Sequence, residues 1–488
     1  MHVLAVMQVD SFADLGELTY LDLSQNRLIM DDTSLPQNLF RSLHKLNKLD
    51  LRRNDPDPDG SYPSNMLAGL THLKVLAIGV FYKVFFPPGF ASLRSLKTLS
   101  LSTNDEVGSL RNRSFEAFRN SSLTELTIGR HGKIHHFITE ACTFCPLRHL
   151  KILRLDLGGV TVVSLLPALY GLQYLNMSVI DFYGCKPPYS ITIDRSSARY
   201  LRNICVSKLS FKNTNLERLA YNAITDADSP LSQCIEHIDL SSNRFIGDFA
   251  AVFKMWLRYK RLRKFELQNQ KIFSLESAGC LLGREESCKD TSDKEHGFSL
   301  RVPISRTLVY MNLSSSIPRF GALPDHLGFT RNNLRCLDLS YSQMSNCISR
   351  FENMDALETL ALNGNNCYNV SENLFDCLPS LRHLHLSNFN VDPEFFREHA
   401  RRMFKNLDQL ETLDLSLNSL VHLDPHMMTS QRRLKELNLA GNHLQSMALN
   451  LAANEQLRVL DLSHNMLPTL TSRERESLDH IQANNNLR

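Results

Sequence analysis

Two short segments of this 488-residue chain hold residue types that could do chemistry. The segment LDLSHN contains Asp461, Ser463 and His464, which are the residue types of a hydrolytic triad. The Asp-x-Ser pair, however, recurs in LDLSQN, IDLSSN and LDLSLN elsewhere in the chain. Such recurrence is typical of a structural repeat, so we assign no catalytic site to this segment.

The second segment is the C-x-x-C pair formed by Cys142 and Cys145. No second pair follows at the spacing of a zinc site, and the surrounding sequence lacks the βαβ pattern of redox domains. The chain also has no glycine-rich phosphate-binding loop. We interpret the pair as structural or disulfide-bonded. The sequence therefore predicts a protein that is not an enzyme and that uses no metal and no cofactor.

A leucine pattern, L-x-x-L-x-L-x-x-N-x-L, recurs along the whole chain. Clear copies are LTYLDLSQNRL at Leu18, LETLDLSLNSL at Leu410 and LRVLDLSHNML at Leu457. We count about 17 copies at intervals of roughly 22 to 29 residues, which is the period of leucine-rich repeats. A Phe-x-x-Leu segment precedes many copies, as at Phe40 and Phe375.

The spacing of these leucines predicts the fold. The L-x-L alternation places leucines on one face of a short strand, and one coil cannot bury them alone, so successive coils must stack. We expect an α/β repeat protein, a leucine-rich-repeat solenoid or horseshoe with a parallel β-sheet on its concave face. The asparagine has a structural role because its amide offers donors and an acceptor to backbone groups in the bend. This structural ladder comprises Asn26, Asn54, Asn104, Asn243, Asn365, Asn418, Asn442 and Asn465.

Residues 274–305 interrupt the repeats with a polar, aperiodic segment that we interpret as a surface loop. The loop separates N-terminal repeats at 1–273 from C-terminal repeats at 306–488, within one continuous solenoid. A smaller excursion is expected at 181–200, and the asparagine is lost near it, at Gly158 and Ile180. Inserts of this kind lie on one face and often bind ligands, although a passively tolerated loop is the alternative. The loop residues that could contact a ligand are Arg284, Lys289, Lys294 and His296.

The chain resembles the extracellular part of Toll-like receptors. The likeness is carried by NNLRCLDLSYSQMSN, MDALETLALNGNNC, LETLDLSLNSL and LRVLDLSHNML. The Phe-x-x-Leu segments differ from the helical outer segments of cytosolic ribonuclease-inhibitor repeats. A cysteine-bearing cap, a transmembrane segment and a cytoplasmic signalling domain are not found in this sequence. We therefore expect the chain to be a fragment of a longer receptor.

The resemblance implies a pattern-recognition receptor of innate immunity. Its ectodomain would bind microbial or danger-associated ligands, and ligand-induced homo- or heterodimerisation with another Toll-like receptor chain would start signalling in the full-length protein. The implied location is extracellular or endosomal-lumenal, with no membrane contact within this chain. The alternatives are a secreted or cell-surface adhesion protein and a cytosolic leucine-rich-repeat scaffold.

The eleven cysteines allow specific pairings if the chain is extracellular. Cys280 and Cys288 could staple the loop, and Cys367 and Cys377 flank a segment within one repeat, although Cys367 could simply be buried in a leucine position. Cys205 and Cys234 each precede a first repeat position. Equivalent positions of stacked coils lie about 5 Å apart, which is within disulfide range.

Five Asn-x-Ser glycosylation acceptors are present, a number that chance alone would produce. Two of them, Asn176 and Asn312, are expected between strand leucines on the concave sheet, where glycans would direct ligands to a lateral face. The five acceptors are Asn112, Asn120, Asn176, Asn312 and Asn369.

Basic residues recur directly after the first repeat leucine, and stacking would align them into a ladder that could bind a phosphate polymer. We favour the alternative that they are ordinary solvated residues, neutralised by nearby aspartates, because the formal net charge is only +3. Nucleic acid is thus a possible partner but not the favoured one. The basic residues are Lys74, Lys97, Lys151, Arg263, Arg335, Arg382, Lys435 and Arg458, and the acidic ones Asp50, Asp239, Asp338, Asp414 and Asp461.

Overall fold

The structure is a computed structural model in which the chain forms two compact units, unit 1 at Met1–Asn243 and unit 2 at Arg244–Arg488. It describes residues 7–55, 62–63, 65, 67–80, 84–103, 109–130, 138–220, 229–245, 259–270, 299–316, 326–330, 332–344, 346–347, 350–468 and 480–482.

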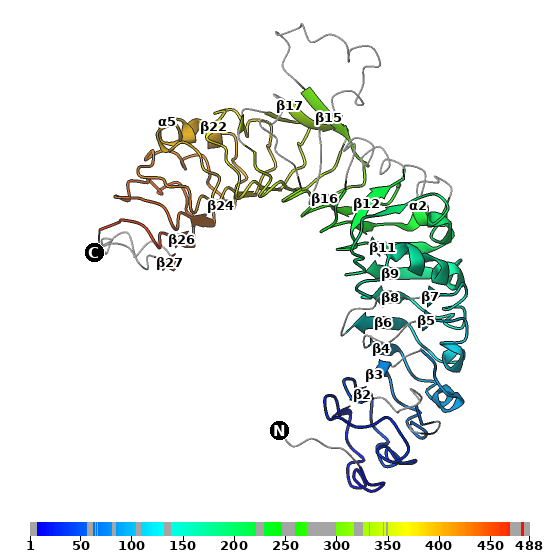
Figure 1. Cartoon of the computed structure of the whole chain (residues 1–488). Coiled ribbons are helices and arrows are strands. Elements are labelled where there is room, and N and C mark those ends of the chain that lie inside the picture. The colour runs from blue at the N-terminus through cyan, green and yellow to red at the C-terminus, as the bar shows by residue number, and fades with distance from the viewer. Residues whose placement is uncertain are drawn as a thin grey trace. The chain divides into compact units, whose positions relative to one another are not determined.

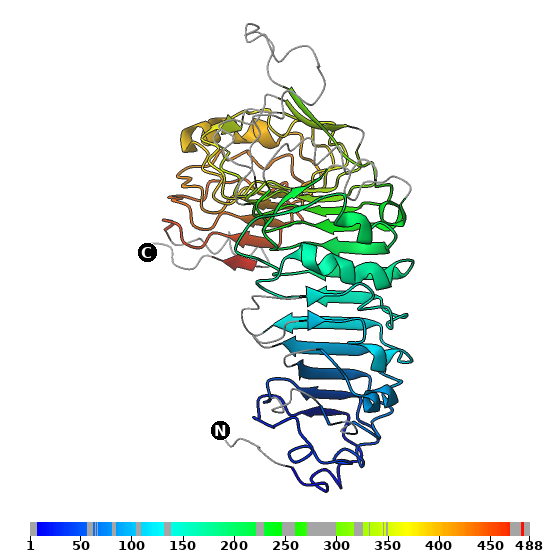
Figure 2. The same ribbon diagram turned by 45° about the vertical axis from the view of Figure 1, so that its right-hand side comes forward.

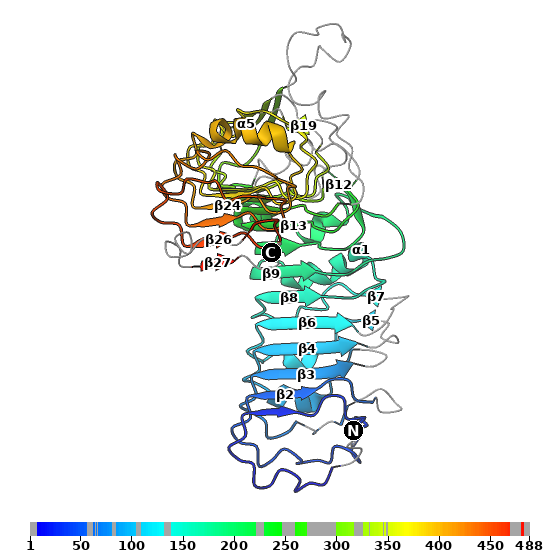
Figure 3. The same cartoon turned by 90° about the vertical axis from the view of Figure 1, so that its left-hand side faces the viewer.

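Unit 1 is a stack of coils, each of which contributes one strand to a parallel sheet (Figures 2 and 3). Each strand pairs in parallel with the next one along the chain. The strands are β1 (Tyr20–Asp22), β2 (Lys48–Leu51), β3 (Val75–Val80), β4 (Thr98–Thr103), β6 (Glu125–Arg130), β8 (Ile152–Leu155), β9 (Asn176–Phe182), β11 (Cys205–Ser210) and β13 (His237–Asp239).

Unit 2 repeats this arrangement. Its strands pair in parallel in chain order and keep one register throughout. They are β14 (Lys264–Glu266), β16 (Tyr310–Asn312), β18 (Cys336–Asp338), β21 (Thr359–Ala361), β23 (His383–His385), β24 (Thr412–Asp414), β25 (Glu436–Asn438), β26 (Val459–Asp461) and β27 (His480–Gln482). The predicted parallel-strand solenoid is confirmed in both units.

The second leucine of the repeat sets the register. Leu49 of β2 pairs with Leu76 of β3, and Leu384 of β23 pairs with Leu413 of β24. All four side chains are fully buried. Each strand therefore places one leucine on the leucines of its neighbours. A coil whose copy of the repeat is imperfect can thus still stack in register with the coils beside it.

The outer side of each coil carries short elements. In unit 1 they are α1 (Val162–Leu165), α2 (Pro230–Cys234), the 3-10 turns η1 (Pro88–Ser92), η2 (Glu116–Phe118), η3 (Leu166–Leu172) and η4 (Ala198–Tyr200), and the strand pairs β5 (Ser109–Leu110) with β7 (Ile138–Thr139) and β10 (Ile191–Ile193) with β12 (Leu216–Leu219). In unit 2 they are β15 (Ser299–Pro303), β17 (His326–Thr330), β20 (Arg350–Glu352), β19 (Asn346–Cys347), β22 (Asn369–Val370) and α5 (Pro393–Phe404). Figure 1 shows β15, β17, β22 and α5 on the side of unit 2 opposite the main strands.

The phenylalanines of the Phe-x-x-Leu segments close the coils on this outer side. The ring centroids of Phe12 and Phe40 lie 5.9 Å apart, and those of Phe375 and Phe404 lie 6.2 Å apart, both pairs stacked. Rings of successive coils therefore stack on one another on this outer side.

Three sequence expectations need correction. The excursion expected at 181–200 begins later, because Asp181 and Phe182 belong to β9, and Ile191 and Ile193 within it are buried in β10, which pairs with β12. The loop at 274–305 ends earlier than expected, because 299–303 forms β15, which pairs with β17. Residues 274–298 lie outside the described residues, and the boundary at 273 stays a prediction.

The third correction concerns the repeat frame near Leu172. Ile180 is not the position that replaces asparagine, because it pairs with Leu153 and Leu209 and is a strand core residue. Cys185 stands in the asparagine position instead, fully buried, with its thiol donating to the Leu155 carbonyl at 3.4 Å.

Candidate functional site

The bends that follow the strands of unit 2 are built by two sets of polar side chains. In the first set, an Asp or Asn on the strand accepts a hydrogen bond from the backbone N–H two residues later. Asp338 accepts from Ser340 at 2.9 Å, Asp414 from Ser416 at 3.0 Å and Asp461 from Ser463 at 2.9 Å. Ser463 Oγ also donates to Asp461 Oδ1 at 2.6 Å. The Asp-x-Ser pairs thus cap the strand ends, a role that the sequence analysis missed.

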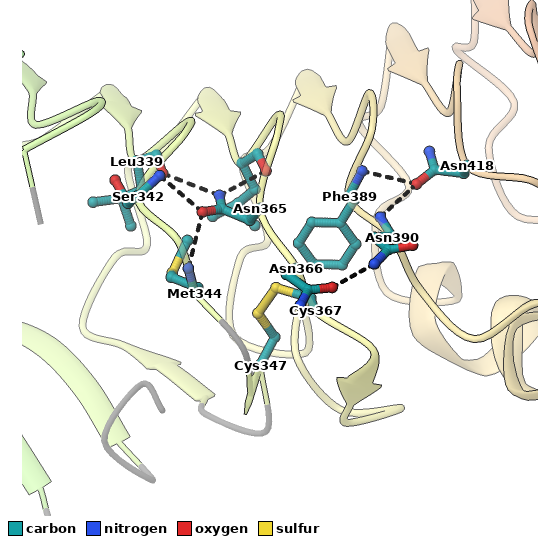
Figure 4. Close-up of a disulfide and its surroundings, with 11 residues drawn as sticks. Leu339, Ser342, Met344, Cys347, Asn365, Asn366, Cys367, Phe389, Asn390 and Asn418 are labelled. Carbon is teal, nitrogen blue, oxygen red and sulfur yellow. Dashed lines mark hydrogen bonds between the residues drawn. A yellow bond between two sulfur atoms is a disulfide. The ribbon is translucent and has the colours of Figure 1, made fainter. Parts of the chain in front are cut away.

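The second set is the asparagine ladder, which joins successive coils (Figure 4). Asn365 Oδ1 accepts from the backbone N–H groups of Ser342 and Met344 in the preceding coil, and its Nδ2 donates to the Leu339 and Leu362 carbonyls. Equivalent bonds are made by Asn54, Asn243, Asn418, Asn442 and Asn465. Asn26 is half-buried and donates to the Ser24 carbonyl, and Asn104 lies outside the described residues.

One residue before the asparagine position, the backbone turns left-handed in every coil of this part. The φ angle is +57° at Tyr341, +64° at Gly364, +58° at Leu417 and +67° at Gly441. A Cβ atom on Gly364 would overlap the Tyr341 ring, and one on Gly441 would overlap the Leu417 side chain. The glycines therefore leave room for these exposed apolar side chains to lie across the next coil.

These bends form a surface without any formal charge. We define the side face as residues 340–344, 363–368, 387–391, 416–423, 440–447 and 463–468, none of which is Asp, Glu, Lys or Arg. Since the strands of these coils are neighbours in one sheet, the six bends extend over about 24 Å. Equivalent bends of unit 1 do carry charge, for example at Arg27 and Arg52.

Large apolar side chains are exposed on the side face. Tyr341 is 60% exposed, Leu417 58%, Tyr368 55% and Met466 42%. Depletion of charge together with exposed aromatic residues and methionine is the composition of protein–protein interface cores rather than of ordinary protein surface. The side face is therefore the candidate interaction surface.

The predicted basic ladder is interrupted by acidic residues at the same repeat position. Arg335 pairs with Glu358 of the next coil at 3.1 Å, and Glu411 lies between Arg382 at 3.2 Å and Lys435 at 2.7 Å. The neutralising groups are thus the glutamates of neighbouring coils. Asp338, Asp414 and Asp461 instead accept backbone hydrogen bonds. Alternation of charge does not suit a polyanion, which needs a continuous row of cations.

Three disulfides lie in the described part of the chain. They join Cys142 to Cys145, Cys205 to Cys234 and Cys347 to Cys367. The Cys205–Cys234 bond, with Cα atoms 5.3 Å apart, links equivalent positions of two stacked coils, as the repeat register suggests.

The suggested pairing of Cys367 with Cys377 is wrong. The Cys367 side chain is fully buried beside Cys347 of the preceding coil (Figure 4). Cys377, by contrast, is a free, exposed thiol. Cys280 and Cys288 lie outside the described residues.

The candidate ligand residues Arg284, Lys289, Lys294 and His296 also lie outside the described residues. Within the described part, no group of three or more His, Cys, Asp or Glu side chains is placed to hold a metal ion. Among the described helices, none has the length and apolar character needed to cross a membrane.

Comparisons with known proteins agree with this geometry. The leucine rich repeat family model matches residues 347–391 and 396–444, which include most of the side face. The mouse CD180 antigen is 31% identical over 151 residues, covering 28% of this chain and 22% of the relative. Toll-like receptor 4 of Pinctada imbricata is 30% identical over 100 residues, covering 20% of this chain and 11% of the relative. The chain thus matches well under two thirds of either relative's length.

Solved structures share the fold along nearly the whole chain. A chain of the mouse RP105/MD-1 complex matches 98% of this chain and 84% of its own length, with a TM-score of 0.53 and 18% identity. A chain of the Drosophila Toll–Spatzle complex matches 96% of this chain and 57% of its own length, with a TM-score of 0.58 and 15% identity. This chain therefore has the leucine-rich-repeat solenoid fold of these receptor chains. The resemblance seen in its repeats is thereby confirmed.

The glycosylation acceptors of this solenoid do not all lie where the repeat frame suggests. Asn312 does lie on the solvent side of the main sheet, in β16. Asn176 does not lie between strand leucines, because the true frame begins at Met177, so Asn176 stands at the entry of β9 and pairs with Cys205. Asn112, Asn120 and Asn369 are exposed away from the main strands. Glycosylation of the five residues stays a prediction.

His385 on β23 makes the stability of unit 2 depend on pH. Burial lowers the pKa of His385 below its ordinary value of 6.5, an effect that His383 increases and Asp414 and Asp338 oppose. The folded state therefore holds the neutral ring, and the unfolded chain binds the proton more tightly. The free energy of unfolding should be unaffected by His385 above about pH 6.5 and should fall as the pH drops below that value.

We expect His385→Asn to flatten this pH dependence in thermal unfolding between pH 7.5 and pH 5. His422→Asn is the matched control, because His422 is exposed and lies on the same unit. Equal pH slopes for the two variants would contradict the role of His385.

Proposed function

We propose that this chain is the recognition ectodomain of an innate-immunity receptor, that it is not an enzyme, and that it lies on the extracellular or lumenal side of a membrane. Support comes from its Toll-like receptor type solenoid and from disulfides between coils, which persist in oxidising compartments. Recognition of a microbial or endogenous ligand would bring two receptor chains together. The observation that carries this proposal is the uncharged side face of unit 2.

The side face suits a second copy of this chain. In a twofold dimer the same patch meets itself, so any net charge on the patch would repel itself. A face with no charge avoids this repulsion, and its exposed amides at Gln343, Asn366, Asn388 and Asn390 offer both donors and acceptors to an identical partner. Tyr341 and Leu417 would supply the apolar contacts.

The size of the face sets the expected affinity. A length of about 24 Å places the patch at the small end of protein interfaces, where association is weak and transient. We therefore expect the chain to dimerise reversibly in the micromolar range, and ligand to strengthen this contact in the full-length receptor.

The test is sedimentation equilibrium of the disulfide-bonded chain with single charge insertions. Leu417→Glu and Tyr341→Glu, which bury a carboxylate in the contact, should each weaken dimerisation at least about tenfold. Tyr170→Glu is the matched control, because Tyr170 is 53% exposed but lies on η3 of unit 1. Dimerisation that is the same in all variants, or absent at every concentration with and without ligand, would contradict the proposal.

A further inference from the structure

Tyr174 is an exposed aromatic residue in a strained backbone conformation. Its side chain is 81% exposed, more than any other large apolar side chain in the described part of the chain. Its φ angle is +68°, in the left-handed region that bulky residues rarely adopt. The backbone N–H donates to the Asn203 carbonyl of the next coil at 2.9 Å, which holds the residue in place. Strain that holds an unpacked ring in solvent points to a use for that ring.

A glycosylation acceptor begins two residues after Tyr174. In the sequence Tyr174-Leu175-Asn176-Met177-Ser178, residues 174, 176 and 178 are exposed, whereas Leu175 is half-buried and Met177 is buried. The Tyr174, Asn176 and Ser178 side chains are therefore all exposed to solvent. Residues two positions apart can be separated by at most about 7 Å of backbone, so a sugar on Asn176 would be within reach of the ring.

The Asn176 amide is available for modification. Lys151 of the preceding coil donates its Nζ to the Asn176 backbone carbonyl at 3.0 Å, and the side-chain amide makes no hydrogen bond within the described residues. The acceptor is therefore held at the strand entry with its nitrogen uncommitted.

We propose that Asn176 carries an Asn-linked oligosaccharide and that Tyr174 is the platform on which its first sugar packs. In the transfer, Asn176 Nδ2 loses a proton and forms a bond to the anomeric carbon of a lipid-diphosphate-linked oligosaccharide. The bond between that carbon and the diphosphate breaks, and the lipid diphosphate leaves with the electron pair. The apolar C–H face of the sugar then covers the ring of Tyr174, while the tyrosine hydroxyl stays in water. This proposal rests on the extracellular or lumenal location proposed above.

A second tyrosine with the same spacing provides an internal comparison. Tyr310 precedes Asn312 by two residues, but Lys264 Nζ lies over its ring, 4.6 Å from the centroid. Asn312 Oδ1 accepts from the Ser314 N–H at 2.9 Å and from its hydroxyl at 2.8 Å, and Asn312 Nδ2 donates to the Tyr310 hydroxyl at 3.4 Å. The ring and the amide are already in use there, so this pair should not act as a platform.

The experiment is a double-mutant cycle on the secreted, glycosylated chain. Site occupancy is measured by peptide mass spectrometry, and the melting temperature is measured for the wild type, Asn176→Gln, Tyr174→Ala and the double variant. We expect Asn176 to be occupied and the two substitutions to be coupled by about 2 °C. The same cycle on chain produced without glycosylation should show no coupling. A cycle of Asn176→Gln with Tyr189→Ala, a 59% exposed tyrosine, is the matched control.

Each outcome has a distinct meaning. An unmodified Asn176 beside sugars at Asn112, Asn120 or Asn369 overturns the site while supporting the proposed location. If a correctly secreted chain carries no sugar on any acceptor, the proposed site at Asn176 is overturned. The proposed function is not decided by that result, because the dimerisation test above decides it separately. An occupied Asn176 with no coupling to Tyr174, or with equal coupling to Tyr189, overturns the platform.

Discussion

Replacement of Asn418 by alanine should destabilise unit 2 by about 3 kcal/mol. Asn418 is 2% exposed, and its Oδ1 accepts from the N–H groups of Phe389 at 2.8 Å and Asn390 at 3.0 Å. Its Nδ2 donates to the carbonyls of Leu386, Leu415 and Ser416. Alanine removes all five bonds and leaves buried backbone groups without partners, each of which costs about 1–3 kcal/mol when water and relaxation cannot replace the bond.

The measurement is hydrogen exchange of the peptides from β23 and β24, read by mass spectrometry. Exchange there should become about 100-fold faster, which is the rate change that corresponds to such a loss. Asn406→Ala is the matched control, because Asn406 is exposed and its side chain bonds only to Asp376 at the surface. An Asn418→Ala protein that exchanges like Asn406→Ala would show that the ladder is dispensable.

Removal of the Cys205–Cys234 disulfide should destabilise the neighbouring coils of unit 1 by about 3–4 kcal/mol. The two cysteines are 29 residues apart in sequence, and the bond closes this loop in the unfolded chain as well as in the folded one. The cross-link limits the conformations of the unfolded chain, and the loss follows from the loop length in the chain-entropy description. The change to test is the double variant Cys205→Ser with Cys234→Ser.

Protection of β9 and β11 against hydrogen exchange should fall in this double variant, and a reducing agent should have the same effect on the wild type. Cys377→Ser is the control, because that thiol is free and exposed. If protection against hydrogen exchange is unchanged in the double variant, the stacking of coils alone stabilises this part of unit 1.

The repeats themselves were predictable from the sequence. Leu49, Leu76, Leu384 and Leu413 occupy the same repeat position in the sequence and the same buried row in the structure. The leucine pattern is local, so the sequence of a single coil already shows which of its side chains must be buried. The pairing of Cys205 with Cys234 could be suggested on the same basis, since equivalent positions of adjacent coils must lie close together.

The sequence predicted the wrong repeat frame where one segment fits the leucine pattern in two ways. Around Leu172 and Leu175 the pattern reads as a repeat start, but the strand core is Met177, Ile180 and Phe182. Only stacking on β8 and β11 distinguishes the two frames, because both bury leucines locally. The pairing of Cys347 with Cys367 escaped the sequence for a similar reason, since it depends on which turns of adjacent coils meet.

The sequence by itself thus determined the repeat, the buried leucine row and the role of the asparagines, because these depend on residues close together in one coil. Only the tertiary structure decided which side chains of different coils meet or are exposed together on the surface. The glutamates that break the basic row and the glycines beneath Tyr341 and Leu417 come from neighbouring coils. Contacts between coils join residues more than 20 positions apart, and the repeat register alone does not say which of the side chains at these positions meet. The side face emerges for the same reason, because six separate bends become one surface only when their coils stack.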